Sequence, residues 1–445
     1  MNADSFRAEA FHYLGFDVDA DDDRVRCRYA LDELEFVEEF RFPGGGDWSA
    51  PAVAEMVRLL FLLAGVSYYK AAAPPVVDFG ETALTATELD FVQEFYRHGL
   101  GEFAYRNGLD LSGTSFAAVP LTRATPAPYA PVAGRPLIPF GGGVDSIVSV
   151  ELLRGQATEP ALFVVNRPGD RFAAIEEPAV VTGYPVVRAE RLMDSKILRS
   201  RELGFLNGHV PVTGVISATA LVAAALEGRD AVVMSNEWSA SSATLKVGDR
   251  EINHQYSKSE AFETGLQKVV QEATGGAPQY FSLLRPFTEL WIAERFAQLS
   301  QYFGTFRSCN RAFLIDPARR AQQWCGDCDK CAFIDLILAP FVPAGQLRAI
   351  FGGREPLERP EQLPQFRTLL ALTPDAKPWE CVGDEAECRV AARLALARPD
   401  RTGNPVLSEL VREADVFTDP STDELLRPVG HHAVPARYAP ADLAR

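Results

Sequence analysis

Basic residues are in short supply in this sequence: 44 Lys and Arg stand against 60 Asp and Glu over 445 residues, a formal net charge of −16. Phosphate polymers and anionic lipid surfaces repel such a chain, so we expect no nucleic-acid partner and no membrane partner. The first residues also lack the basic-then-apolar pattern of a secretory signal peptide. With 47% hydrophobic and 23% charged residues, the composition is that of an ordinary globular protein.

The sequence is also poor in long apolar runs and in cysteine. The longest apolar run, residues 209–228, contains Pro211 and several Ser and Thr residues, so it predicts a buried helix rather than a membrane span. The seven cysteines are an odd number, and three of them crowd into residues 325–331. This pattern suits a reducing cytoplasm and a metal site better than a disulfide framework, so we expect a cytoplasmic protein.

The first part of the chain predicts an α+β domain. Alternating polar and apolar residues up to about residue 42 predict antiparallel strands, and helical spacing follows over 51–68 and 86–99. The stretch 118–138 is rich in Pro and Ala, which is typical of a linker. We therefore place an N-terminal α+β domain at residues 1–133.

The middle of the chain has the pattern of a parallel α/β sheet. Short apolar strands alternate with helices here, with strands predicted at 137–140, 160–166, 184–190 and 229–237 and a helix at 214–227. Ligands of such sheets bind at the carboxyl ends of the strands, so the polar residues that follow the strands are the candidates for a site. We assign the α/β domain to residues 134–332. A helical C-terminal region is predicted over 333–445, with its last thirty residues loosely ordered.

One of these strand ends carries a glycine loop without a lysine, "PFGGGVDSIVS" at residues 139–149. A Walker A loop requires that lysine, and a dinucleotide-binding fingerprint requires a later third glycine, so neither motif fits. Gly141, Gly142 and Gly143 can turn sharply and point backbone N–H groups at an anion, and the helix that follows adds its positive end. Asp145 would be repelled by phosphates unless Mg²⁺ lay between them. An ordinary glycine-rich turn is the alternative.

The loop resembles the PP-loop of the ATP pyrophosphatases, whose usual form is S-G-G-x-D-S, with Gly141 in place of the first serine. The resemblance implies an adenine nucleotide alpha hydrolase-like fold that binds ATP and Mg²⁺ and releases pyrophosphate. It also implies nucleotide contacts from the three glycines and Ser146, with Asp145 as the magnesium ligand. Further candidates for ATP contacts follow the other strands, namely Asn166, Ser235 and Asn236.

A second motif is C-x-x-C-x-x-C at Cys325, Cys328 and Cys331, with Cys309 sixteen residues before it. Four thiolates at this spacing can close a tetrahedral Zn²⁺ site, and Gly326 permits the tight turn. An iron–sulfur cluster uses the same ligands, and reduced thiols without metal are the third alternative. Because four protein ligands leave no open position, a bound Zn²⁺ would be structural. Deazaguanine-nitrile synthases, which are PP-loop enzymes, carry a similar site.

The segments between these motifs resemble the UDP-N-acetylmuramoyl-L-alanyl-L-glutamate epimerases. The most specific are N-E-x-S-A-S at 236–241 and N-H-Q-Y-S-K-S at 253–259, within a resemblance that covers about residues 1–400. The resemblance implies that ATP and Mg²⁺ activate the terminal L-Glu of UDP-MurNAc-L-Ala-L-Glu as an acyl-adenylate. The glutamate would then be inverted to D-Glu, with release of AMP and diphosphate, in the synthesis of peptidoglycan precursors.

Inversion of an α-carbon requires a group that removes a proton and a group that returns one. His254, Tyr256 and Lys258 alternate, so on an extended segment they would share one face. His254 is the candidate for proton transfer because histidine titrates near neutrality, with substrate binding as an equal alternative for His254 and Tyr256. Lys258 suits a phosphate or carboxylate contact. Glu237 suits a Mg²⁺ contact, proton transfer or a loop anchor.

Four further residues are candidates for holding the anionic substrate: Arg167, Gln255, Ser257 and Arg285. A surface role is the alternative for Arg285. Histidines outside these segments are given no role, namely His12, His98, His431 and His432. Cys381 and Cys388, seven residues apart on a predicted helix, are given none either.

Two other functions compete with the epimerase at this point. One is a PP-loop enzyme that forms an amide or nitrile or thiolates a base or tRNA, although the acidic charge and the 236–241 and 253–259 segments disfavour it. The other is a nucleotide sensor that folds around zinc and produces no AMP. We favour the epimerase.

Overall fold

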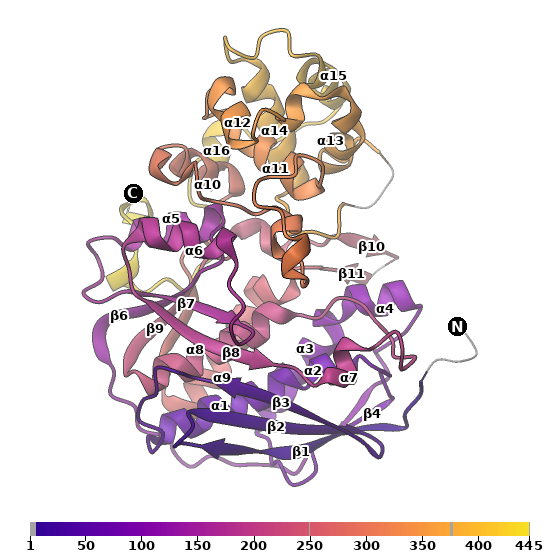
Figure 1. The fold of residues 1–445 in the computed structure, drawn as a ribbon, viewed down its shortest axis with the longest axis vertical. Helices are drawn as coiled ribbons and strands as arrows, with labels where there is room; N and C mark the ends of the chain where they lie inside the picture. Colours follow the sequence, from indigo (N-terminus) through magenta and orange to yellow (C-terminus); the bar gives the residue numbers. More distant parts are fainter. Residues whose placement is uncertain (1–5, 249, 374–376, 445) are drawn as a thin grey trace.

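The computed structural model describes residues 6–248, 250–373 and 377–444, and its centre is a ten-stranded sheet (Figure 1). The strands lie in the order β12-β9-β6-β7-β8-β3-β2-β1-β4-β5. Their bounds are β1 Ala10–Asp19, β2 Arg24–Leu31, β3 Leu34–Arg41, β4 Val76–Asp78, β5 Ser115–Ala117, β6 Val132–Pro139, β7 Ala161–Asn166, β8 Val186–Leu192, β9 Arg229–Met234 and β12 Gln279–Ser282. A separate hairpin consists of β10 Leu245–Val247 and β11 Arg250–Ile252.

The parallel half of the sheet reverses its strand order beside β6. Strands β7 and β8 follow on one side of β6, whereas β9 and β12 lie on the other side, and all four pairings are parallel. The loops that leave β6 and β9 therefore run in different directions and open a crevice at the carboxyl ends of the strands. The predicted α/β sheet is confirmed, and each predicted strand overlaps an observed one.

The N-terminal strands continue this sheet. Strands β1, β2 and β3 form an antiparallel meander, as predicted, and β3 pairs antiparallel with β8, with Phe40 opposite Arg191. The sheet thus runs across the predicted boundary between residues 133 and 134. The boundary itself stays a prediction, but the two parts share one backbone hydrogen-bond network.

Helices cover both faces of the parallel half of the sheet, whereas β2 and β3 alternate buried and exposed residues. Side chains alternate along the strands, so that Phe163 and Val232 enter one core while Leu162 and Val233 enter the other. One face packs against α1 Pro51–Ala64, α3 Ala86–Gly99, α8 Val212–Leu226 and α9 Glu260–Thr274. The opposite face packs against α5 Val144–Leu153, α6 Ala173–Thr182 and α10 Glu289–Phe296. Short helices are α2 Val66–Tyr69, α4 Gly101–Asn107, α7 Ser195–Leu198 and α16 Thr422–Leu425.

The most apolar helices belong to the core. The run at 209–228 forms α8, which is buried along most of its length, so the predicted buried helix is confirmed. A second segment, Pro51–Tyr69, is long and apolar enough to cross a membrane, but 83% of its most apolar window is buried in the protein. Burial of that extent is typical of a core helix.

The C-terminal region is helical, as predicted, and stands over the carboxyl ends of the parallel strands (Figure 1). Its helices are α11 Asp329–Leu338, α12 Ala344–Ile350, α13 Leu363–Leu369, α14 Glu385–Leu396 and α15 Pro405–Ala414. The prediction that the last thirty residues are loosely ordered is wrong. Tyr438 is fully buried, stacks on Phe281 with ring centroids 5.8 Å apart, and donates a hydrogen bond to Asp230 Oδ2 at 2.8 Å.

Candidate active site

The glycine loop joins the end of β6 to the start of α5. Gly143 is the N-cap of α5 and gives the helix no side-chain cap, which leaves first-turn N–H groups available to an anion. Gly142 has φ +73°, and a Cβ there would stand 2.1 Å from the Ala174 carbonyl oxygen. The Ser146 hydroxyl donates to the Gly143 carbonyl at 3.1 Å. The backbone of this loop is therefore shaped as an anion cradle that only glycine can form at position 142.

A cavity of about 420 Å³ lies above this loop, at the point where the strand order reverses. One side, which we call the loop wall, carries Gly141, Gly143, Asp145, Ser146, Ser235 and Asn236. The other side, which we call the opposing wall, carries Arg307, Ser308, Asn310, Lys330, Glu380 and Cys381. Lys258 reaches the same cavity, and its apolar surface includes Phe163 and Ile216. The site is therefore built from residues far apart in the sequence.

Asp145 is the acidic group of the loop wall. Burial and the neighbouring carboxylate of Glu237 raise the pKa of Asp145 to about 6. Burial and the carboxylates of Asp145 and Glu237 also raise the pKa of Glu289 well above its usual range. Carboxylates that repel one another beside an anion cradle fit a divalent cation with oxygen ligands, such as Mg²⁺.

The other predicted ATP contacts lie at the ends of β7 and β9. Ser235 lines the cavity, and within the described part of the chain its buried hydroxyl has no hydrogen-bond partner. Asn236 also lines the cavity and donates to the Ser282 hydroxyl at 3.0 Å. Asn166 is buried, and its amide donates to the Arg167 carbonyl at 2.7 Å. The Ser235 hydroxyl and the Asn166 carboxamide oxygen thus lack partners among the described residues, whereas the amide nitrogens of Asn236 and Asn166 are already engaged.

His254 is held by a carboxylate from the N-terminal part of the chain. Its Nδ1 lies 2.5 Å from Glu102 Oε2, and the His209 ring packs against it at a tilt of 43°, with centroids 4.3 Å apart. Burial lowers the pKa of His254, but interactions with Cys381 and Glu102 outweigh burial and raise it to about 9. Burial and the charge of His254 lower the pKa of His209 to about 4. At neutral pH the pair therefore consists of one protonated and one neutral imidazole.

Glu102, His209 and His254 also offer ligand atoms within 4.8 Å of one another, so this group could hold a metal ion. Glu102, however, already pairs with Arg106 at 2.6 Å as well as with His254. Glu102 is therefore bonded to both Arg106 and His254, while His209 Nδ1 lies 3.9 Å from the same carboxylate. Neither Glu102 nor His209 is a candidate from the sequence, because Glu102 lies outside the recognised segments and His209 opens the 209–228 run, which predicts only a buried helix.

The structure differs from the sequence-based interpretation most clearly at Cys381, for which the sequence predicts a place on a helix and no role. It precedes α14 rather than lying on the helix with Cys388, and its Sγ accepts a hydrogen bond from Lys258 Nζ at 3.1 Å. Burial raises the pKa of Cys381, but Lys258 and His254 outweigh burial and lower it to about 6. Burial lowers the pKa of Lys258, while Cys381 and Glu237 raise it above its ordinary value. A cysteine given no role from the sequence is therefore a charged group of the cavity.

The four clustered cysteines lie next to the opposing wall. Their sulfur atoms are all within 4.8 Å of one another, with Cys325 and Cys328 at 3.6 and 3.5 Å from Cys331. Gly326 has φ +68°, and a Cβ there would meet the Arg354 carbonyl oxygen at 2.9 Å. Sulfur atoms this close surround one ion at the usual Zn–S distance of about 2.3 Å. The four cysteines that the sequence groups together are thus close enough in the structure to hold one ion, and zinc binding stays a prediction.

Two family models match the chain. The model for the MurL N-terminal domain matches residues 2–283, and the model for the MurL C-terminal domain matches residues 305–425. The chain belongs to the MurL family. The resemblance to the epimerases is thereby confirmed at the level of the family, whereas placement in the PP-loop superfamily stays a prediction.

Curated relatives of the MurL chain carry the name UDP-N-acetyl-alpha-D-muramoyl-L-alanyl-L-glutamate epimerase. The protein from Xanthomonas oryzae pv. oryzae is 38% identical, over 97% of this chain and 96% of the relative. The protein from Salinispora tropica is 37% identical, over 98% of this chain and 96% of the relative. No solved structure matches the chain.

The prediction that His254, Tyr256 and Lys258 share one face is wrong. Residues Tyr256–Lys258 form a 3₁₀ turn, so residues two apart point in different directions. The Tyr256 ring stacks on His98 at 5.3 Å and lines a neighbouring cavity of about 890 Å³. Lys258 lines the candidate active site and His254 lies next to its Cys381, whereas Tyr256 lines the neighbouring cavity.

Arg285 is a buried anchor rather than a surface residue. Its guanidinium donates to Glu263 Oε2 at 3.0 Å and to the Glu237 carbonyl at 2.7 Å, and also to the Lys258 carbonyl. These bonds hold the backbone of two predicted catalytic residues, Glu237 and Lys258, so its position does not support direct substrate binding.

The other predicted substrate contacts have distinct surroundings. Gln255 and Ser257 are buried in the turn, and the Gln255 carboxamide oxygen has no hydrogen-bond partner among the described residues. Arg167 is half-exposed and donates to Asp170 Oδ2 at 3.0 Å and to the Ile315 carbonyl at 2.7 Å. Substrate contacts by these three residues stay predictions.

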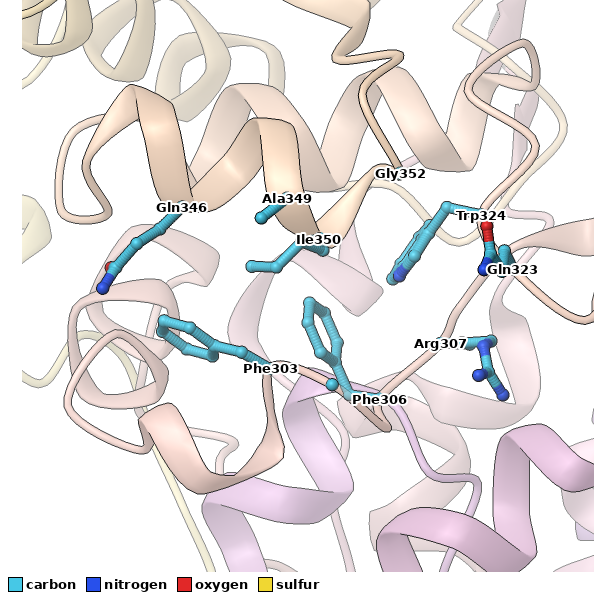
Figure 2. Close-up of a pocket in the computed structure, with 10 residues that line it drawn as sticks. Phe303, Phe306, Arg307, Gln323, Trp324, Gln346, Ala349, Ile350 and Gly352 are labelled. Carbon is cyan, nitrogen blue, oxygen red and sulfur yellow. The ribbon is translucent and has the colours of Figure 1, made fainter.

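A further cavity of about 320 Å³ lies behind the opposing wall (Figure 2). Figure 2 shows Phe303 and Phe306 facing Ile350 of α12 across it, with Trp324 at the far side. Arg307 borders both this cavity and the candidate active site. Trp324, which precedes Cys325 in the chain, and Arg307 of the opposing wall thus line the same cavity.

Proposed function

We propose that this chain epimerises the terminal L-Glu of UDP-MurNAc-L-Ala-L-Glu to D-Glu, using ATP and Mg²⁺ and releasing AMP and diphosphate. The observation that supports this most is a single cavity in which an anion cradle faces a cluster of charged side chains. Gly143 and Ser146 of the cradle face Lys258 across about 420 Å³, with His254 just behind. The names of the relatives supply the substrate, and we place the reaction in peptidoglycan precursor synthesis in the cytoplasm as part of the same proposal.

The chemistry explains why both halves of the cavity are needed. The α-proton of a glutamate is hard to remove beside a carboxylate, because the carbanion would form next to a negative charge. Transfer of AMP to that carboxylate removes the charge and gives the enolate a carbonyl on which to place its electrons. Water then attacks the acyl carbon and releases AMP, which makes the cycle irreversible.

Each part of the loop wall has a role in this scheme. The N–H groups of the loop and the Ser146 hydroxyl would bind the departing diphosphate. Asp145, with Glu237 near it, would hold Mg²⁺, which neutralises phosphate charge when bound. Lys258 would contact the phosphate or the carboxylate. Cys309, Cys325, Cys328 and Cys331 would hold a structural Zn²⁺ that fixes the opposing wall.

One assay tests the class of reaction. Purified protein is incubated with UDP-MurNAc-L-Ala-L-Glu, ATP and Mg²⁺, and the glutamate configuration is measured after hydrolysis together with AMP and diphosphate. We expect D-Glu, AMP and diphosphate only when all three components are present. ATP turnover without D-Glu, or D-Glu without ATP, would contradict the proposal.

Isotopes test the order of steps. In D₂O the product glutamate should carry deuterium at Cα only when ATP is present. Substrate labelled with ¹⁸O in the α-carboxylate should pass label to AMP, because the oxygen that attacks the α-phosphate leaves with AMP. Unlabelled AMP would exclude an acyl-adenylate that is hydrolysed at its acyl carbon.

A further inference from the structure

A charged cluster on the opposing wall is centred on Cys381. Its Sγ accepts a hydrogen bond from Lys258 Nζ at 3.1 Å, and His254 lies beside it with Nδ1 engaged by Glu102 at 2.5 Å. Cys381 lines the same cavity as Asp145 and Ser146 of the loop wall. The sulfur is therefore surrounded by cationic groups and still open to the space where the activated substrate would lie.

Other cysteines of the chain show what this environment changes. Cys388 lies on α14 and is buried among apolar residues, where burial raises its pKa well above the ordinary value. Burial also raises the pKa of Cys27, which lies on β2 in the N-terminal part of the sheet. At Cys381 the nearby cations outweigh burial, and the pKa falls to about 6. Cys381 is therefore a thiolate at neutral pH, and Cys388 is a thiol.

The groups next to Cys381 cannot remove a proton themselves at neutral pH. The pKa of His254 is raised to about 9, and that of Lys258 is raised above its ordinary value, so both carry their protons. A general base must be unprotonated at the working pH. The thiolate is the basic group among these three.

We propose that Cys381 is a catalytic residue whose thiolate removes the α-proton of the activated glutamate from one face of Cα. This assignment rests on the proposed epimerase function. His254, oriented by Glu102, is then a positioning residue that keeps the sulfur ionised, and Lys258 holds the same charge from the other side.

The step balances without any oxidant or reductant. An S–H bond forms as the Cα–H bond breaks, and the electron pair of that bond moves into the acyl carbonyl to give an enolate. A solvent-derived proton adds to the opposite face of Cα, and the carbonyl re-forms. The thiol then gives its proton to solvent before the next turnover.

The decisive variant is Cys381→Ser, which keeps the size of the side chain but replaces the thiolate with a neutral hydroxyl. In D₂O with UDP-MurNAc-L-Ala-L-Glu, ATP and Mg²⁺, we expect deuterium uptake at Cα to fall by about 10³-fold. Exchange of labelled diphosphate into ATP, which reports activation alone, should stay within about threefold of wild type. The matched control is Cys388→Ala, which should retain both activities.

Several results would overturn the assignment. Wild-type deuterium uptake by Cys381→Ser, or loss of both activities in a natively folded variant, would remove Cys381 from proton transfer. A covalent substrate adduct on Cys381 in acid-quenched wild-type enzyme would make it a nucleophile instead. If wild-type enzyme shows no substrate-dependent diphosphate exchange, the proposed function fails, and that failure is distinct from any result with the variant.

Alkylation tests the ionised state directly, because a buried neutral cysteine with only a structural role would not react near pH 6. Native protein is treated with iodoacetamide across a pH series, and each cysteine is followed by peptide mass spectrometry. Cys381 should react with a midpoint near pH 6, and Cys27 and Cys388 should stay unmodified. Charged groups facing Cys381 are Lys258, His254, Lys330, Asp145 and Glu380. Lys258→Met should raise the midpoint, and reaction of Cys381 no faster than that of Cys388 would refute the ionised state.

Discussion

The two walls of the candidate active site are built in opposite ways. The loop wall comes from the ends of β6 and β9. Its geometry follows from a short local sequence, in which only glycine fits the backbone at position 142. The opposing wall comes from residues beyond 305, and Cys381 lies in a connection before α14. One wall is thus rigid by local backbone geometry, whereas the other depends on how the helical region is held over the sheet.

The difference teaches where each wall is vulnerable. The loop wall rests on strands buried on both faces, so a substitution there should change ligand binding more than folding. The opposing wall is adjacent to the four-cysteine cluster, since Lys330 lies between Cys328 and Cys331 and contacts the Cys381 carbonyl. Loss of the cluster should therefore displace active-site groups as well as destabilise the region.

The largest expected effect is on the cysteine cluster. Cys325→Ser should give poorly soluble protein or a much lower melting temperature, because structural Zn²⁺ in small sites contributes roughly 10–16 kcal/mol of apparent binding free energy. Wild-type protein should contain about one zinc per chain by elemental analysis. Cys381→Ser is the comparison, and it should retain the metal and the melting temperature. Metal-free wild-type protein, or a Cys325→Ser variant that melts like wild type, would contradict the zinc assignment.

The next effect is on the loop wall. Gly142→Ala should abolish AMP formation, because its Cβ would stand 2.1 Å from the Ala174 carbonyl oxygen at φ +73°. Gly141→Ala is the matched control, since a Cβ there meets no atom within 4 Å, and it should keep a substantial part of the activity. Equal ATP affinity in the two variants, measured by calorimetry, would mean that the loop does not bind phosphate.

Much of the loop wall could be predicted from the sequence. Strand, glycines, Asp145 and helix are contiguous, so the spacing of residues 139–149 carries the geometry. The grouping of the cysteines could also be predicted from the sequence, because three of them fall within one turn and the start of α11. In both cases the chain itself fixes the distances between functional groups.

The charged cluster around Cys381 could not be predicted, because its members meet only after folding. Glu102, His254 and Cys381 come from α4, a loop after β11 and the connection before α14, and no spacing rule joins them. The extended face expected for His254, Tyr256 and Lys258 failed for a local reason, since residues 256–258 turn into a 3₁₀ helix. Tertiary packing therefore decided the first outcome, and local backbone geometry decided the second.

A smaller effect tests the orientation of His254. Glu102→Gln removes the carboxylate that lies 2.5 Å from His254 Nδ1, so the pKa of His254 should fall toward its ordinary value. We expect deuterium exchange at Cα to fall by about 10-fold to 100-fold, the scale on which supporting shells tune a site. Diphosphate exchange into ATP should be unchanged. Glu94→Gln is the control, because Glu94 pairs with the half-exposed His98 and should have no effect.

The smallest effect is a proton released from the loop wall when Mg²⁺ and ATP bind. The folded pKa of Asp145 is raised to about 6 by burial and by Glu237, so its ionisation destabilises the free enzyme above about pH 6, and this destabilisation disappears below its ordinary pKa of 3.8. A bound cation would favour the ionised form and lower that pKa. At pH 6 binding should therefore release about half a proton from Asp145, and at pH 8 almost none.

Calorimetry in two buffers of different ionisation enthalpy measures this release. Asp145→Asn serves as the reference, because it lacks the titrating group while the protons of ATP itself still contribute. The difference between wild type and Asp145→Asn at pH 6 should approach half a proton and should vanish at pH 8. An equal release from both proteins at pH 6 would show that Asp145 stays outside the coordination sphere. The magnesium site would then have to be built from Glu237 and Glu289 alone, away from the cradle that Gly142 shapes.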